Sequence, residues 1–233
     1  PEDSDIEKCK EWAKSTVKSS LINTFGRLFF LTGGLFYKEN EVKMSFNQMV
    51  INFSAPTFCR IKPGNLFFVR NNLFLKKNFD EWKKTFSEHG IMSFSLELSE
   101  SSTAILVIDV FRVNKILNDI HVRNYLSKKG YEYSDEFGFI NELFMRIKYN
   151  EVFPHEVGII LGYPLNDVIE FEKQHGTNFK YGGYWKSYSD VENAKKCQCK
   201  YNDCSCLCKN LYDNGFSLSQ IINEYNKYAY DLR

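Results

Sequence analysis

The sequence predicts an α+β protein, with a small antiparallel or mixed sheet of three to four strands, helices packed on it, and a mainly helical C-terminal half. Two neighbouring patterns indicate the sheet. Residues 103–111 are almost continuously apolar, as in a central strand covered on both faces. Residues 92–98 alternate apolar with polar side chains, as in a strand that is buried on one face only. The short turn between them, residues 100–102, predicts a hairpin.

The elements before this hairpin follow from breaks and periodicity. A strand is expected over residues 65–71, directly after Pro63-Gly64. A helix follows it and ends at Gly90. Its apolar stripe repeats at intervals of four, three and four residues: Leu75, Phe79, Trp82 and Phe86. The hairpin strand then begins near residue 91, and residues 181–187 are a candidate fourth strand.

The chain after the hairpin is predicted to be mainly helical. One helix is expected from Val113 to Gly130, and Ser134 can cap the next one. Two later pairs have the spacing of a reciprocal capping box, namely Ser189 with Glu192 and Ser217 with Gln220. Helices should therefore begin near residues 190 and 218.

The domain organisation is expected to be simple. Residues 47–233 are predicted to form a single α+β domain, and residues 1–46 a helical N-terminal extension with a helix-like stretch from Ile6 to about Leu31. Met44 could be an original start codon. The alternative, an N-terminal helix that packs on the domain, stays equally open.

Charge and cysteine usage limit the function classes. The 30 Lys and Arg balance 29 Asp and Glu, which argues against a nucleic-acid partner because phosphate binding usually requires a basic excess. Seven cysteines, an odd number, do not fit a secreted disulfide framework, and no signal peptide is recognisable. The apolar stretch 21–37 is too interrupted to span a membrane. A cytoplasmic location is expected, and nothing indicates an oligomeric state.

Four short segments resemble a known bacterial family. They are APT (55–57), IKPGNLF (61–67), FPHEVGIILGYP (153–164) and YGGYWKSYSD (181–190). In this order and spacing they resemble the clostridial family catalogued as domain of unknown function 3793, over residues from about 47 to 233. Family members often carry His-Cys before APT, where this chain has Phe53-Ser54. The resemblance implies no activity, because the family has none established.

The segments that carry the resemblance also supply the first candidate site. Aromatic rings beside a lysine and a histidine can line a pocket for a flat or anionic ligand. The leading hypothesis is therefore a cytosolic protein that binds a small molecule or cofactor of unknown identity. Its candidate ligand-binding residues are His155, Glu156, Tyr163, Tyr184, Trp185, Lys186 and Tyr188.

No recognised catalytic motif in the sequence assigns a reaction to this site. His155-Glu156 lacks the second histidine of a zincin helix, because position 159 is Ile, and a structural histidine at a helix start is the simpler interpretation. Neither a Gly-x-Ser-x-Gly elbow nor a phosphate-binding glycine loop is found. Whether the protein is an enzyme stays undecided.

The second candidate site is a metal site for zinc or iron in the C-terminal half. Cysteine thiolates are preferred ligands of both zinc and iron–sulfur centres. The candidate ligands are Cys197, Cys199, Cys204, Cys206 and Cys208. All five cannot converge from one straight helix, and the structural alternative is a core stripe in which cysteine acts as a small hydrophobe. That stripe would contain Cys197, Tyr201, Cys204, Cys208 and Leu211.

A third pattern is that of a helix-turn-helix over residues 155–175. Gly158, Gly162, Val168 and Phe171 occupy the positions that this motif uses. The second helix is acidic, however, with Asp167, Glu170 and Glu172 against Lys173, and it would repel phosphates. A structural corner of two short helices is favoured over a DNA-binding module.

Overall fold

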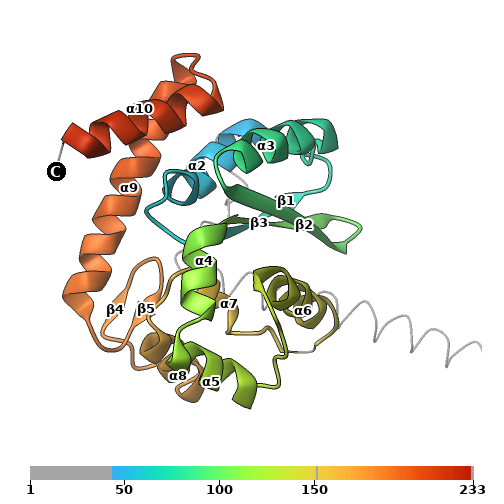
Figure 1. Cartoon of the computed structure of the whole chain (residues 1–233), viewed down its shortest axis with the longest axis vertical. Coiled ribbons are helices and arrows are strands. Elements are labelled where there is room, and N and C mark those ends of the chain that lie inside the picture. Colours follow the sequence, from blue (N-terminus) through green and yellow to red (C-terminus); the bar gives the residue numbers. More distant parts are fainter. Residues whose placement is uncertain (1–43, 151, 232–233) are drawn as a thin grey trace, which may run out of the picture.

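The computed structural model describes residues 44–150 and 152–231, and an antiparallel sheet lies at the centre of them (Figure 1). Its strands are β1 (Gly64–Arg70), β2 (Ile91–Ser99) and β3 (Ser102–Asp109), in the order β1-β3-β2. Both pairs are antiparallel, so the predicted hairpin is confirmed as β2-β3. The helix expected over residues 6–31 lies outside the described residues.

The central strand β3 separates two apolar cores. Leu106 and Ile108 contribute to one core, whereas Ile105 and Val107 contribute to the other. The predicted coverage on both faces is therefore confirmed. The strand ends at Asp109, two residues earlier than expected, because the Asp109 carboxylate accepts a hydrogen bond from the Arg112 amide (3.2 Å) and starts a helix there.

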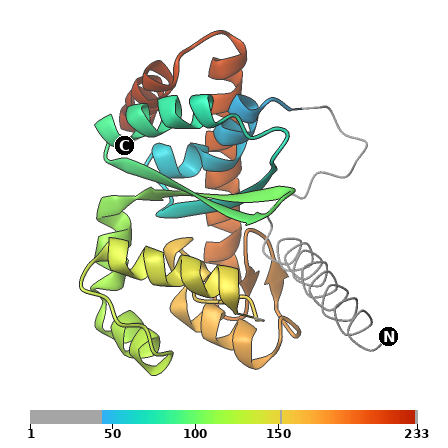
Figure 2. The same cartoon turned by 90° about the vertical axis from the view of Figure 1, so that its right-hand side faces the viewer.

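Helices from both ends of the described chain cover one face of the sheet. They are α2 (Phe46–Phe58), α3 (Lys76–Glu88), α9 (Val191–Asp213) and α10 (Leu218–Asp231). Long helix α9 runs past the edge of the sheet, and α2 packs between it and the strands (Figure 2). In α3 the predicted stripe of Phe79, Trp82 and Phe86 is buried, but Leu75 precedes the helix and is 52% exposed.

The other face of the sheet is covered by the middle of the chain (Figure 1). Its helices are α4 (Val110–Leu117), α5 (Ile120–Lys128), α6 (Glu136–Tyr149), α7 (Val157–Ile160) and α8 (Leu165–Lys173). The single helix predicted from Val113 to Gly130 is wrong. Asp119 interrupts it, because its carboxylate accepts hydrogen bonds from the amides of His121 and Val122 and so caps a new helix. Helix α6 is likewise capped by Asp135 instead of Ser134.

The fourth strand predicted at residues 181–187 does not join the main sheet. Instead β4 (Tyr181–Gly182) and β5 (Lys186–Ser187) pair with each other in a separate hairpin. This hairpin leads into α9, whose cap is Asp190 and not Ser189. The capping box of Ser217 and Gln220 is confirmed at the start of α10.

Candidate functional site

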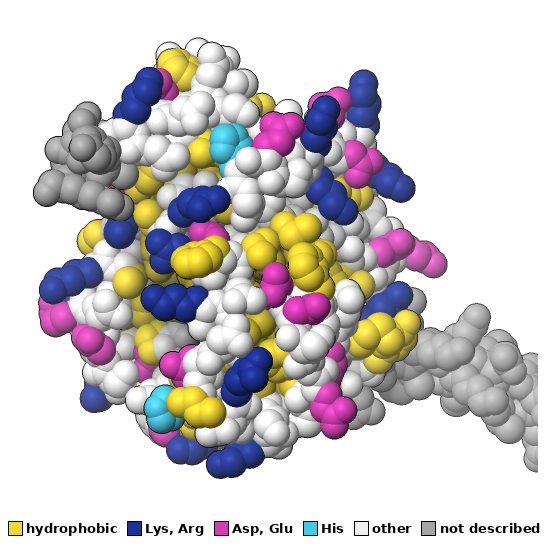
Figure 3. Space-filling model, viewed as in Figure 1, with side chains coloured by type: hydrophobic (Ala, Val, Ile, Leu, Met, Phe, Trp, Pro, Cys, Tyr) yellow, Lys and Arg dark blue, Asp and Glu magenta, His cyan; other side chains and the backbone are white. Residues whose placement is uncertain are grey.

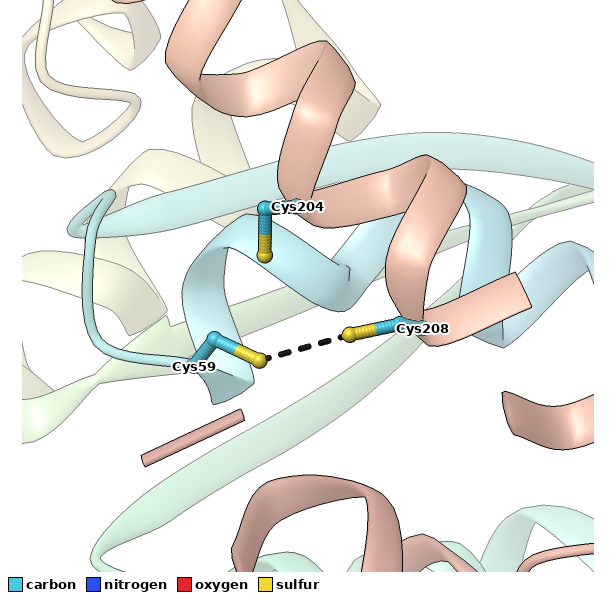
Figure 4. A group of neighbouring side chains, drawn as sticks. All are labelled: Cys59, Cys204 and Cys208. Atoms are coloured by element: carbon cyan, nitrogen blue, oxygen red, sulfur yellow. Dashed lines mark hydrogen bonds between the residues drawn. The ribbon is translucent and has the colours of Figure 1, made fainter. Parts of the chain in front are cut away.

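Three cysteines meet where the end of α2 packs against α9 (Figure 4). Cys59 directly follows α2, and Cys204 and Cys208 lie one turn apart on α9. The three Sγ atoms all lie within 4.8 Å of one another, and those of Cys59 and Cys208 are 3.5 Å apart. We call these three residues the thiol cluster.

The thiol cluster is buried in the core shared by α2, α3, α9 and α10. Its side chains are at most 3% exposed, and Ile221 and Ile222 of α10 belong to the same core. Hydrogen bonds from Cys208 and Cys59 lower the pKa of Cys204 to about 5. Burial raises the pKa of Cys59, and the bond to Cys204 raises that of Cys208. One sulfur is thus prepared to carry charge while the other two donate to it.

The spacing of the sulfurs suits a soft metal ion. A tetrahedral ion with Zn–S bonds of about 2.3 Å places its thiolates roughly 3.8 Å apart. The observed Sγ separations, from 3.5 Å to within 4.8 Å, bracket that value. Three protein ligands would leave a fourth coordination position for water or another ligand.

The predicted metal ligands are only partly brought together. Cys204 and Cys208 converge, whereas Cys199 and Cys206 are exposed elsewhere on α9. Cys197 is half-buried, with its Sγ 3.8 Å from Asn193 Oδ1. Cys59 was not a candidate from the sequence, because only tertiary packing brings it to α9. The one local signal is that Cys204 and Cys208 share a helix face.

A second constellation surrounds Lys62, in the connection between α2 and β1. Lys62 is 2% exposed, and its Nζ lies 5.2 Å from the ring centroid of Tyr184, 5.7 Å from that of Tyr201 and 5.8 Å from that of Tyr163. Among the described residues, Lys62 Nζ makes no side-chain hydrogen bond or ion pair, whereas the Lys62 amide donates to the carbonyl of Pro56 (2.9 Å). Burial lowers the pKa of Lys62 to about 7. We call Lys62 and these three rings the lysine–tyrosine site.

Two glycines hold this site together by close backbone contact. Gly162 has a φ of +80°, and a Cβ there would lie 2.6 Å from the ring of Pro63. A Cβ on Gly64 would lie 2.5 Å from the carbonyl oxygen of Ile160. The segments around Lys62 and Tyr163 can therefore interlock only because both positions lack a side chain.

The predicted ligand-binding residues from 153–164 and 181–190 do come together. Tyr163 stacks on Trp185 with ring centroids 5.4 Å apart, and both Tyr163 and Tyr184 face Lys62. Trp185 Nε1 donates a hydrogen bond to Asp167 (2.7 Å). Trp185, Lys186 and Tyr188 are all buried in internal contacts of this kind. Lys186 Nζ donates a hydrogen bond to the carbonyl of Gly176, and the Tyr188 amide donates one to Asp167.

His155 and Glu156 have other neighbours. The His155 ring packs edge-on against Phe171 with centroids 5.1 Å apart, and burial lowers its pKa. Its Nδ1 is buried without a hydrogen-bond partner. Glu156 lies 3.8 Å from Lys129 Nζ, and Lys129 also pairs with Glu172. The described contacts therefore separate this pair from the lysine–tyrosine site.

The helix-turn-helix pattern forms the expected corner. Helices α7 and α8 meet at the turn around Gly162, and Asp167 of α8 is buried against the β4-β5 hairpin. On the face of the molecule in Figure 3, basic and acidic side chains are interspersed. The structural role of the corner accounts for the pattern, and DNA binding stays a disfavoured prediction.

A comparison with known protein families covers the residues of both sites. A family model described as "Protein of unknown function (DUF3793)" matches residues 50–222. The chain belongs to this family. Neither the search of curated proteins nor that of solved structures found a match.

The DUF3793 match covers both constellations, from Cys59 and Lys62 to Cys208. It also covers the four segments on which the resemblance rests, and those at 61–67, 153–164 and 181–190 meet at the lysine–tyrosine site. No helix within residues 44–150 and 152–231 combines the length and the apolar character needed to cross a membrane. The family label carries no activity, so function must be argued from the two sites.

Proposed function

We propose that this DUF3793 protein is a cytosolic metal-binding protein that holds zinc or iron through Cys59, Cys204 and Cys208. One observation carries the proposal: three buried Sγ atoms lie within 4.8 Å of one another. Thiolates are the ligands that zinc and iron–sulfur centres prefer. The reducing cytosol would keep the cluster free of disulfides.

The convergence of the sulfurs is what favours a metal over simple packing. Burial of cysteine as a small hydrophobe does not by itself bring three sulfurs from distant segments together. Here Cys59 and Cys208 are 149 positions apart in the chain, yet their sulfurs are 3.5 Å apart. A metal ion would neutralise the thiolates and bind α2 to α9, so metal binding should also stabilise the fold.

Elemental analysis of protein purified without oxygen tests this function. About one zinc or iron per chain is expected, and Cys59→Ser should bind at least tenfold more weakly because it removes one ligand. Cys206→Ser is the matched control, since Cys206 is exposed on the same helix and should leave the metal content unchanged. A circular dichroism spectrum shows whether each variant is folded.

A specific combination of results would refute metal binding. Metal below a tenth of an equivalent in the wild-type protein, together with an unchanged thermal midpoint after zinc or iron is added anaerobically, would refute the metal function. Ligand binding to the native state raises the midpoint, so this second measurement detects a site that is emptied during purification.

A second candidate function, binding of a small molecule or cofactor, is favoured by the lysine–tyrosine site. Tyr163 and Tyr184 are only partly buried, and they cover an amine that has no hydrogen-bond or ion-pair partner among the described residues. Such rings bind flat ligands through their faces. Native mass spectrometry of freshly purified full-length protein should show an added mass that is lost on denaturation and reduced by Tyr184→Ala. The bare protein mass in every preparation would oppose this function.

A further inference from the structure

The lysine–tyrosine site has an unusual composition for a protein interior. Lysine is almost never fully buried unless it is paired, because removal of its charge from water is costly. Lys62 is nevertheless 2% exposed, and the rings of three tyrosines among the described residues lie within 6 Å of its Nζ. A lysine held in this way is suited to react as a neutral amine.

We propose that Lys62 is a nucleophilic amine that forms an imine with an aromatic aldehyde or ketone held against the partly buried rings of Tyr163 and Tyr184. This inference rests on the small-molecule function above and names its ligand class. Rings from three separate segments, those of Tyr163, Tyr184 and Tyr201, have their centroids 5.8, 5.2 and 5.7 Å from Lys62 Nζ. Their faces suit a flat ligand, and their bulk excludes water from the imine.

The chemistry is balanced without any further reagent. The lone pair of Lys62 Nζ attacks the carbonyl carbon, and a C–N bond forms as the C=O π electrons move to oxygen. Proton transfer from nitrogen to oxygen gives a carbinolamine. Loss of water then forms the C=N bond, and the water carries away the carbonyl oxygen with both amine hydrogens. Nothing is oxidised or reduced, and hydrolysis reverses the step.

The environment keeps the amine available for this attack. Burial lowers the pKa of Lys62 to about 7, so a large share of it is neutral at cytosolic pH. An exposed lysine has a pKa of about 10.4, and only roughly one in a thousand is neutral there. The titratable groups of the described residues that have a ring within 6 Å of Lys62 Nζ are the three tyrosines. Burial raises the pKa of Tyr184 and Tyr201, so they stay uncharged near neutral pH.

Reductive trapping with pyridoxal tests the inference. Full-length protein is incubated with pyridoxal, the imine is reduced with borohydride, and labelled lysines are located by peptide mass spectrometry. At pH 7.5, Lys62 should be labelled at least tenfold faster than the exposed Lys76 and Lys77. The ratio should fall toward pH 10, as the exposed lysines also lose their protons. Lys62→Met should remove the fast label and leave the slow ones.

The contrary outcome is labelling of Lys62 no faster than that of Lys76 in the native protein. A parallel reaction in urea, where all lysines are equally accessible, shows that the Lys62 peptide can be detected and so makes that outcome decisive. If native mass spectrometry finds a retained small molecule while Lys62 is not labelled faster, the imine is refuted and the small-molecule function stands.

Discussion

At the scale of single residues, Lys62 links pH to stability. Its pKa is about 7 in the folded protein and 10.5 by the ordinary lysine value. Between these pH values the unfolded chain binds more protons than the folded one, so the free energy of unfolding rises with pH. Below pH 7 the cost of the buried charge is fully present, on the order of a few kcal/mol.

Substitution of Lys62 by methionine should therefore stabilise the protein. The gain in the free energy of unfolding should be largest below pH 7 and should decline toward zero as the pH approaches 10.5, because the wild-type amine is then neutral in both states. Urea titrations of both proteins at a series of pH values measure this gain in the free energy of unfolding. Lys76→Met, at an exposed position, is the control and should show no such trend. A gain independent of pH would contradict the assignment.

Gly162 is the second residue with a specific consequence. Gly162→Ala should destabilise the protein by about 2–4 kcal/mol, because it combines a left-handed backbone with a Cβ 2.6 Å from Pro63. Gly215→Ala is the matched control, since its φ of +85° is similar but no atom lies within 4 Å of its Cβ. It should cost only about 1–2 kcal/mol. Equal losses in chemical denaturation would show that the Pro63 contact is unimportant.

At the scale of elements, Asp167 joins α8 to the loop of the β4-β5 hairpin and to the residues directly after it. Its carboxylate accepts hydrogen bonds from Trp185 Nε1, the Tyr188 amide, and the amide and hydroxyl of Ser189. Because the group is 2% exposed, a lost acceptor leaves buried donors unpaired.

Asp167→Asn should therefore cost about 2–4 kcal/mol of unfolding free energy and change the fluorescence of Trp185. Asp190→Asn makes the same chemical change at the cap of α9, where asparagine is equally suitable, and should be nearly neutral. Urea unfolding of both variants measures the difference. A neutral Asp167→Asn would mean that the hairpin is held by other contacts.

Local patterns predicted some elements well and others poorly. The strands β2 and β3 and helix α3 were correct, because each buries a face whose period is visible within ten residues or so. Periodicity does not predict the break at Asp119, since Asn118-Asp119 looks like a polar helix surface unless the cap is considered. A strand pattern does not specify its pairing partner, so residues 181–187 look like a fourth strand of the sheet although they pair with each other.

Local sequence patterns predicted even less of the thiol cluster and of the lysine–tyrosine site. The sequence led to Cys204, Cys208, Tyr163 and Tyr184, which belong to recognisable clusters or motifs. It did not lead to Cys59, a single cysteine whose partners are on a helix far along the chain. Nor did it lead to Lys62, because a lysine in a connection is usually solvated. Tertiary packing decides both positions.

At the scale of the whole molecule, β3 is shared by both cores. Ile105 and Val107 belong to one core, and Leu106 and Ile108 belong to the other. Loss of either helical layer would expose one face of this strand, so the described chain should unfold as one unit. Hydrogen exchange should be slowest at the β3 amides and should match the global free energy of unfolding there. Two separate transitions in calorimetry would contradict this.

The packing of α2 against α9 has a consequence for biosynthesis. Cys59 and Lys62 leave the ribosome before Cys204, Cys208 and Tyr201, which all belong to α9. Neither site can be assembled on a nascent chain that ends before residue 191. A polypeptide that ends before α9 should therefore show neither the proposed metal binding nor the proposed imine formation.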